Sequence, residues 1–237
     1  MLFIDRLDAG RQLAGRLASF RSERPIVLAL PRGGVVVGYE VARALDAPLD
    51  VVVARKLGAP YYPEFGIGAI AEGDARVLDE RTVRGLGISE KQIERVEAEE
   101  RLELERRIRR YRGDRPPPDL RNRTVILVDD GLATGVTARA AIEGIRPRQP
   151  RKLILAVPVC AEETAQALRA QIDDLVCVAT PFEFQAVGAW YSNFEQTSDE
   201  EVHALLERRR REMEAAGVEV GSGAGRGRSN PGGKIGM

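Results

Sequence analysis

The chain has 237 residues, 43% of them hydrophobic, and its 36 Lys and Arg residues balance its 36 Asp and Glu residues. This length and composition fit one large α/β domain, and the zero net charge gives no general attraction to nucleic acid or to an anionic membrane. The single histidine, His203, lies in a highly charged stretch, which argues against Ser-His-Asp catalysis and multi-histidine zinc sites.

The first part of the chain predicts a helix followed by a βαβ unit. Leucines and alanines at helical spacing predict an amphipathic helix over 8–21. PIVLAL at 25–30 is an apolar run suited to a strand buried on both faces, and 49–56 (LDVVVARK) is a second such strand. The segment 35–45 supplies the crossover helix that parallel strands need.

The middle of the chain predicts an insertion. Residues 58–80 are rich in glycine and alternate in short pieces, which favours a small antiparallel flap or an irregular insertion over a core element. Ser89 then caps a long charged stretch that ends before Gly113 and carries one thin apolar stripe, as in a mostly solvated helix. The prolines of 115–119 end this helix and return the chain to the core.

The last part of the chain alternates strands and helices again, which predicts a doubly wound parallel sheet. The expected elements are a strand at 124–130, a helix at 134–145, a strand at 152–159, a helix at 162–170, a strand at 174–180 and a helix at 200–216. We expect one domain over 1–216, with its insertion at about 58–113, and a disordered glycine-rich tail over 217–237.

One stretch, VILVDDGLATGVT at 125–137, carries a chemical signature. Asp129 and Asp130 end a buried strand, where ligands of open α/β sheets collect. The loop then enters a helix whose first N–H groups attract an anion, with hydroxyl donors at Thr134 and Thr137 and a flexible backbone at Gly135. Carboxylates would repel a phosphate but suit hydroxyls or a magnesium-linked group of the same ligand. The pattern indicates a ribose 5-phosphate site; a structural Asx turn is the alternative.

These thirteen residues resemble the signature of type I phosphoribosyltransferases, which bind 5-phosphoribosyl-1-pyrophosphate (PRPP). The resemblance implies the doubly wound fold of that family, with a small hood. It implies that Asp129 and Asp130 hold the ribose 2- and 3-hydroxyls. The 5-phosphate would be bound by Ala133, Thr134, Gly135, Val136 and Thr137.

The loop after the first strand is PRGG, at 31–34. Its glycines free backbone N–H groups for an anion, and Arg32 adds a positive charge. The resemblance implies that Arg32, Gly33 and Gly34 bind pyrophosphate, with Arg32–Gly33 as our candidate for a non-proline cis peptide bond. A plain glycine-rich turn is the alternative.

The second strand ends in Arg55 and Lys56. Two cations at the end of a strand buried on both faces need an anionic partner, which a bound pyrophosphate would supply. The resemblance places a pyrophosphate-side Lys or Arg at this point. A surface pair at a strand end is the alternative.

Four features resemble the predicted bacterial and archaeal phosphoribosyltransferases whose acceptor is unassigned. They are the stretches ALPRGG, VARKLGAP and AVGAWYSNF and the long insertion at 58–113. The resemblance implies a lid over PRPP and a hood that recognises the acceptor. Glu64 lies on the insertion, where the lid would be. Trp190 and Tyr191 are suited to stacking on a base, and packing of the hood onto the sheet is the alternative.

The resemblance implies transfer of 5-phosphoribose to a nitrogen acceptor, such as a nucleobase, with release of pyrophosphate. Mg²⁺ would enter bound to the substrate, and the protein itself would hold no metal. Arg32, Arg55 and Lys56 would offset charge on the leaving group. The catalytic candidates are Asp130, Lys56 and Glu64, with Asp130 or Glu64 handling the proton of the acceptor.

A non-catalytic regulator that binds PRPP or a nucleotide is the alternative function. Such regulators usually carry a nucleic-acid-binding module or a basic face, and the basic clusters here alternate with acids. We therefore favour the enzyme, acting without nucleic acid. The long charged helix would suit pairing in a homodimer.

The expected location is the cytoplasm. Cys160 and Cys177 are the only cysteines and show no CxxC spacing, which is typical of a reducing compartment. The first residues do not have the apolar core of a signal peptide, and no run reaches the roughly 18 apolar residues of a membrane span.

Overall fold

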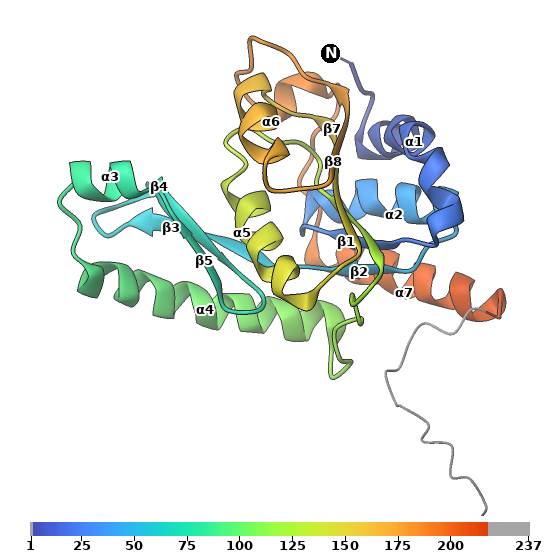
Figure 1. The fold of residues 1–237 in the computed structure, drawn as a ribbon, viewed down its shortest axis with the longest axis horizontal. Coiled ribbons are helices and arrows are strands. Elements are labelled where there is room, and N and C mark those ends of the chain that lie inside the picture. Colours follow the sequence, from blue (N-terminus) through green and yellow to red (C-terminus); the bar gives the residue numbers. More distant parts are fainter. Residues whose placement is uncertain (1, 218–237) are drawn as a thin grey trace, which may run out of the picture.

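The computed structural model describes residues 2–217. Its centre is a five-stranded parallel sheet in the order β2-β1-β6-β7-β8 (Figure 1). The strands are β1 (Ile26–Ala29), β2 (Leu49–Val51), β6 (Thr124–Val128), β7 (Lys152–Val159) and β8 (Asp174–Ala179). The predicted parallel sheet is confirmed.

Helices cover both faces of the sheet. On one face lie α1 (Arg6–Arg16) and α2 (Gly33–Leu45), and on the other α5 (Val136–Ile145) and α6 (Glu162–Arg169). Successive strand side chains point to opposite faces, so Val27 and Ile126 pack on α1 and α2, while Ile26 and Val125 pack on the α5 side. Because both faces are buried, the strands read as continuous apolar runs.

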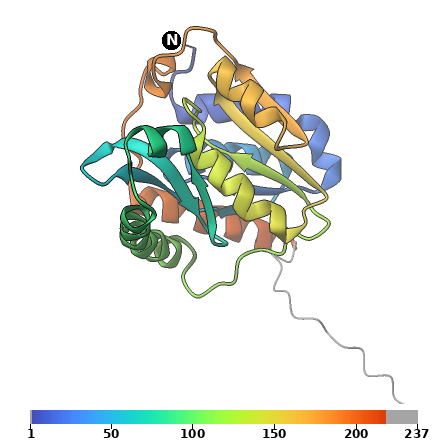
Figure 2. The same cartoon turned by 60° about the vertical axis from the view of Figure 1, so that its left-hand side comes forward.

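An arm extends from one side of this body (Figure 1). It consists of an antiparallel sheet of β3 (Ala54–Ala59), β4 (Tyr62–Ala71) and β5 (Ala75–Leu78), followed by α3 (Glu80–Gly85) and α4 (Glu90–Arg112). Figure 2 shows α4 nearly end-on beside the small sheet. The predicted flap and long helix are confirmed, and Ser89 forms a capping box with Gln92 at the start of α4.

The arm is attached to the body through the last turns of α4. Tyr111 is buried in an apolar cluster with residues of β3, β4 and α7 (Asp199–Ala215). Arg112, only 4% exposed, forms ion pairs with Asp50 and Glu72 and donates to the carbonyl of Val51 at 2.7 Å. The apolar stripe of α4 predicted its packing, but not the buried arginine.

The predicted strand at 49–56 is in fact two strands. β2 ends at Val51 in the parallel sheet, and β3 begins at Ala54 in the arm. The whole run is apolar because residues 51–53 are buried at the junction of the two sheets, and periodicity alone does not show where a strand changes sheet.

The beginning of the described chain pairs with a segment near residue 190. Phe3 forms an isolated parallel bridge with Tyr191, after the short helical turn η3 (Val187–Trp190). Around it, N–H groups of Leu2 and Phe3 donate to the carbonyl of Trp190. We call residues 180–195 the hood. The predicted disordered tail lies outside the described residues, apart from Gly217.

Within residues 2–217, no helix is both long and apolar enough to cross a membrane.

Candidate active site

The two polar loops predicted from the sequence leave the sheet side by side. β1 and β6 are parallel neighbours, with Ala29 opposite Val128, and the N–H of Leu30 donates to the carbonyl of Val128 at 2.9 Å. The carboxyl edge of the sheet therefore places 31–34 next to 129–130. Ligands of open α/β sheets bind at this edge.

The loops touch so closely that neither glycine can carry a side chain without movement. A Cβ atom at Gly33 would lie 1.9 Å from Oδ2 of Asp130, and one at Gly34 would lie 2.9 Å from Cα of Asp129. Neither glycine has a positive φ. Close approach to the carboxylates, rather than backbone conformation, therefore requires glycine at both positions.

A non-proline cis peptide occurs in this loop, one bond earlier than expected. It joins Pro31 to Arg32, so the assignment to Arg32–Gly33 is wrong. The sequence marks the loop by its glycines, but which bond is constrained depends on how the loop packs against its neighbours.

The backbone of this loop offers free donors. Within residues 2–217, the N–H groups of Arg32, Gly33 and Gly34 donate to no protein acceptor. The Arg32 side chain also makes no hydrogen bond to any of the residues that the structure describes. The pKa of the Asp199 carboxyl is lowered by the hydrogen bond from the Tyr111 hydroxyl, then by the charge of Arg110 and then by that of Arg32. The Arg32 guanidinium therefore lies near Asp199. Free N–H groups of this kind are what the predicted pyrophosphate site requires.

Asp129 and Asp130 are adjacent carboxylates in a sheltered position. The N–H of Asp130 donates to Oδ1 of Asp129 at 2.8 Å. Burial, and then the neighbouring Asp130 charge, raise the pKa of Asp129 well above its ordinary value. Burial also raises the pKa of Asp130, against the opposing effect of Arg6. Carboxylates held in this costly state suit a ligand that donates hydrogen bonds to them.

Arg6 is a site residue that the sequence did not reveal. Its Nε donates to Oδ2 of Asp130 at 2.7 Å, and its Nη1 donates to the carbonyl of Glu195 at 2.7 Å. The guanidinium also lies over the ring of Phe194, 3.9 Å from the ring centroid. No local pattern marked this residue, because it begins an ordinary amphipathic helix.

The loop before α5 has the geometry of an anion cradle. Gly135, with φ of 67°, is the left-handed N-cap of the helix. Within residues 2–217, the N–H groups from Ala133 to Thr137 donate to no protein acceptor, and the hydroxyls of Thr134 and Thr137 make no hydrogen bond. These donors lie at a helix N-terminus, where the sequence predicts the 5-phosphate site.

Arg139, one turn into α5, adds a second unpredicted cation. Its Nε is buried and has no hydrogen-bond partner in the described part of the chain. Helical side chains lean toward the N-terminus, so this one extends toward the loop before the helix. A buried donor without a partner is rare in folded proteins, and an anion bound in the cradle would supply one.

Arg55 and Lys56 do not end a strand of the parallel sheet, contrary to the prediction. Both lie in β3 of the arm, and the Arg55 guanidinium forms an ion pair with Glu100 of α4 at 2.6 Å. Arg55 therefore already has an anionic partner. Lys56 is exposed, and its strand neighbour Ala69 belongs to the cluster that packs on α5, so Lys56 projects from the α5 side of the arm.

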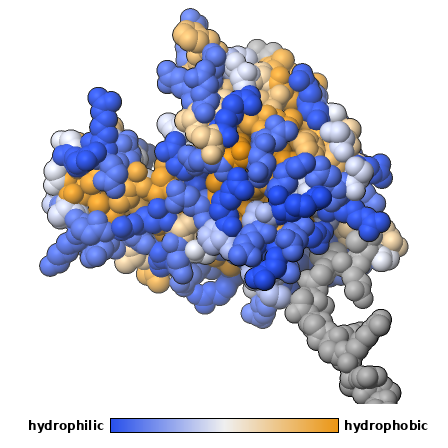
Figure 3. Space-filling model, in the orientation of Figure 1, coloured by the Kyte–Doolittle hydropathy of each residue, from blue (hydrophilic) through white to orange (hydrophobic). Residues whose placement is uncertain are grey.

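Glu64 lies in the exposed first half of β4, near the end of the arm. Tyr61 and Tyr62 beside it are 79% and 73% exposed. Figure 3 shows the surface hollowed between the arm and the part of the body that carries α6. The structure thus places Glu64 on the predicted insertion, without a hydrogen bond to Asp130.

Tyr191 is not available to stack on a base, which corrects the prediction. It is 2% exposed, its ring packs between Phe3 and Phe194, and its hydroxyl donates to the carbonyl of Asp130. Trp190 is half-buried and stacks on Phe184. The pattern WY showed that aromatic rings gather in the hood, but not which ring faces inward.

Residues 2–217 contain no group of three or more His, Cys, Asp or Glu side chains arranged to hold a metal ion. The acidic groups at the site are the adjacent carboxylates of Asp129 and Asp130. A divalent cation bound to a phosphorylated ligand would bring its remaining oxygen ligands with it.

The family model for the phosphoribosyl transferase domain matches residues 4–192. A protein of Mycobacterium tuberculosis H37Rv, provisionally named a phosphoribosyl transferase, is 48% identical over 217 residues, which is 92% of this chain and 49% of that protein. The chain therefore spans about half the length of the curated relatives it matches.

The crystal structure of the protein TT1426 from Thermus thermophilus has a similar fold. Its TM-score is 0.74 and its sequence is 44% identical, with 88% of this chain and 99% of that chain covered. The similarity therefore extends over most of this chain and nearly all of that protein.

Proposed function

Because the chain belongs to the family of phosphoribosyl transferase domains, we propose that it transfers the 5-phosphoribosyl group of PRPP to a nitrogen acceptor and releases pyrophosphate. An enzyme is preferred to a regulator because the basic clusters of the chain alternate with acidic residues and do not form the basic face that such regulators usually carry.

The contact of Gly33 with Asp130 is the observation that carries this proposal. PRPP has a phosphate at C5, hydroxyls at C2 and C3, and pyrophosphate at C1. The site offers groups for these three parts of PRPP in the same order. They are an anion cradle at 133–137, two carboxylates at 129–130 and a second loop of free N–H groups at 31–34. The carboxylates separate two anion sites, as the ribose separates two phosphorylated ends.

In the proposed reaction, the bond between C1 and the pyrophosphate oxygen breaks and a bond from C1 to the acceptor nitrogen forms. Both electrons of the broken bond leave with pyrophosphate. The N–H groups of 32–34, the Arg32 guanidinium and the Lys56 ammonium would stabilise this charge, together with Mg²⁺ that enters bound to PRPP. Donors fixed in advance by the fold lower the barrier without reorganising during the step.

The acceptor nitrogen loses a proton when it bonds to C1. We propose Asp130 as the group that takes it, because this carboxyl lies in the site against Gly33, whereas Glu64 lies in the exposed part of the arm. Burial raises the pKa of Asp130, which makes its carboxylate a better proton acceptor.

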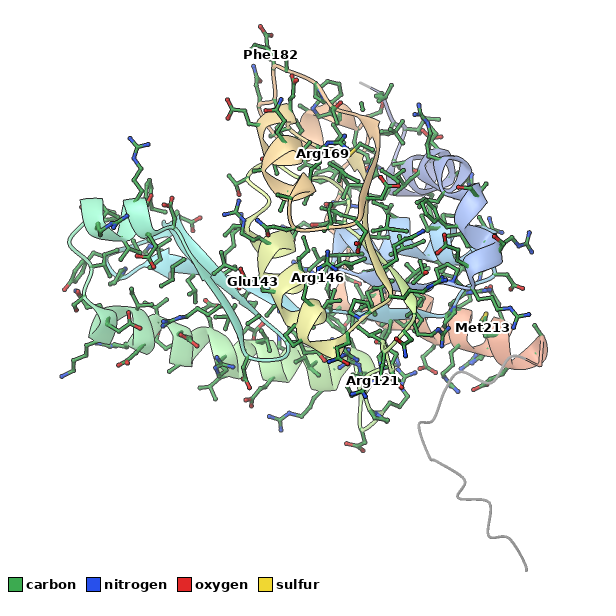
Figure 4. All side chains as sticks on the ribbon, in the orientation of Figure 1. Arg121, Glu143, Arg146, Arg169, Phe182 and Met213 are labelled. Carbon is green, nitrogen blue, oxygen red and sulfur yellow. The ribbon has the colours of Figure 1, made fainter. Side chains whose placement is uncertain are left out.

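The hood would contact the acceptor. A methyl group at Gly131 would lie 2.5 Å from Val187, so the hood packs directly on the loop that follows the two aspartates. Phe182 is 88% exposed at the outer end of the hood (Figure 4), and Trp190 presents part of its ring. Flat apolar rings favour a flat acceptor such as a nucleobase.

Calorimetric titration of PRPP with Mg²⁺ tests the binding step. We expect micromolar affinity for the wild-type protein and no measurable binding for Asp129→Asn with Asp130→Asn. Asp114→Asn, an exposed change outside the site, is the matched control and should bind normally. Absence of PRPP binding to the folded wild-type protein would refute the proposal.

Pyrophosphate release with a panel of nitrogen acceptors then tests the transfer step. Release with at least one acceptor, abolished by the double asparagine variant, is the expected result. PRPP binding without release for any acceptor would instead favour the non-catalytic PRPP-binding regulator.

A further inference from the structure

We propose that Arg6 is a positioning residue of this site: its guanidinium fixes the Asp130 carboxylate at the junction between the ribose and pyrophosphate positions. This inference rests on the proposed function for its catalytic consequence, but its structural part can be tested without PRPP. Arg6 lies at the start of α1, far from the loops in sequence.

The contact between Arg6 and Asp130 is short and sheltered from water. Nε of Arg6 lies 2.7 Å from Oδ2 of Asp130, and the two side chains are 12% and 16% exposed. Exposed ion pairs contribute little because water screens them and their side chains are mobile. A sheltered, hydrogen-bonded pair instead fixes one orientation of both groups.

Arg6 is itself held in place from the opposite side. Its Nη1 donates to the carbonyl of Glu195 at 2.7 Å, and its guanidinium carbon lies over the ring of Phe194. A planar, always charged group that is hydrogen-bonded and stacked loses little further freedom when it binds a carboxylate. The hood thus determines where the guanidinium lies, and the guanidinium determines where Oδ2 of Asp130 lies.

Arg6 also borders the pyrophosphate loop. A Cβ atom at Gly33 would lie 2.5 Å from Nε of Arg6 and 1.9 Å from Oδ2 of Asp130. Both side chains therefore occupy the space that the absent glycine side chain leaves open. The Arg6–Asp130 ion pair therefore borders the pyrophosphate loop, beside the place proposed for C1 of a bound PRPP.

The charge balance points the same way. Among the residues that the structure describes, Arg6 is the one cation that bonds to either aspartate of the pair. Without it, two adjacent carboxylates would repel each other, and the side chain of Asp130 would turn toward solvent or take up a proton. In either case Oδ1 and Oδ2 would no longer be held for a ribose hydroxyl.

The test compares Arg6→Lys and Arg6→Ala with Arg11→Ala. Arg11 is the matched control, because it lies on the same helix and forms an ion pair with Glu40 at 3.3 Å, outside the site. Misplacing a reacting group by about 1 Å can cost roughly 100-fold in rate. We expect Arg6→Ala to lower kcat/KM for PRPP by about that factor and Arg11→Ala to leave it unchanged.

Two further readouts separate positioning from a merely structural role. Millimolar guanidinium should restore part of the activity of Arg6→Ala, because a free cation can occupy the space beside Asp130. Arg6→Lys should keep part of the activity, since it retains the positive charge but loses the hydrogen bond to the carbonyl of Glu195 in the hood. A crystal structure of Arg6→Lys or Arg6→Ala without substrate should show the Asp130 carboxylate displaced.

The outcomes distinguish this inference from the proposed function. Normal kinetics in Arg6→Ala, with active wild-type protein, would overturn the inference and leave the function intact. Inactive wild-type protein would refute the function, and the crystal structures would still decide the inference: an unmoved Asp130 carboxylate overturns it, and a displaced one supports it.

Discussion

At the scale of single residues, the site combines groups that are costly to hold together. Asp129 and Asp130 are adjacent, and burial raises the pKa of both. Gly33 and Gly34 leave no room between the loops. Such arrangements reduce stability, and sites that bind charged ligands are where proteins retain them.

Asp129→Asn should stabilise the protein at neutral pH while abolishing PRPP binding. The pKa of Asp129 in the folded state is raised above its unfolded value, so its contribution favours folding below about pH 4 and is lost as pH rises through the folded pKa. Asparagine carries no such charge. Urea unfolding should give the wild type and Asp129→Asn equal free energies of unfolding at pH 4, and Asp129→Asn the larger one at pH 8. A smaller free energy of unfolding for Asp129→Asn at pH 8 would contradict this account.

Gly33→Ala should weaken PRPP binding at least tenfold with little loss of stability, because the new methyl group meets the ends of the Asp130 and Arg6 side chains rather than backbone. Gly15→Ala is the control: nothing lies within 4 Å of its Cβ position, and alanine in a helix stabilises by up to about 1 kcal/mol. Calorimetry and thermal unfolding of both variants check the prediction. Equal PRPP affinity in Gly33→Ala would mean that the loop contact is not part of the site.

At the scale of elements, the loops are predictable and their partners are not. The strand, loop and helix around 125–137 form as expected because each follows from local composition: β-branched residues, then glycine and hydroxyls, then alanines. Arg55 and Lys56 were misplaced because a continuous apolar run did not show that the chain leaves one sheet for another at residues 52–53.

Arg112 should be the main anchor of the arm. Removing one partner of a buried ion pair costs about 3–5 kcal/mol, because the remaining charges, here Asp50 and Glu72, stay buried without compensation. Arg112→Met should therefore lower the free energy of unfolding by about that amount. Arg95→Met, on the exposed face of the same helix, should change it by less than about 0.5 kcal/mol in chemical denaturation. Similar losses for both would rule out a special role for Arg112.

At the scale of the whole molecule, the site depends on two segments that are far apart in the chain, the first helix and the hood. Arg6 comes from the first helix, and Tyr191 donates its hydroxyl to the carbonyl of Asp130 from the hood. The bridge between Phe3 and Tyr191 joins these two segments. The loops of the parallel sheet are thus completed by residues about 190 positions apart in sequence.

Phe3→Ala should loosen this junction. Its side chain is 1% exposed, and replacing a buried phenylalanine by alanine typically costs about 3–5 kcal/mol. The backbone carbonyl of Trp190, the single tryptophan of the chain, accepts hydrogen bonds from Leu2 and Phe3, so the fluorescence of this residue should report the change directly. Leu2→Ala, at a 44% exposed position, is the control. Unaltered fluorescence and stability in Phe3→Ala would show that the hood folds independently of the N-terminal segment.

The sequence by itself determined the doubly wound sheet, the arm as an insertion and the two loops that form the candidate site. These features follow from local causes, namely side-chain period, capping residues and the glycine and hydroxyl content of short segments. Only the tertiary structure decided that Arg6 binds Asp130, that Tyr191 is buried and that Arg55 binds Glu100. The contact of Arg6 with Asp130 joins residues 124 positions apart. Such a contact depends on how helices pack on the sheet, and packing leaves no periodic signal in the chain.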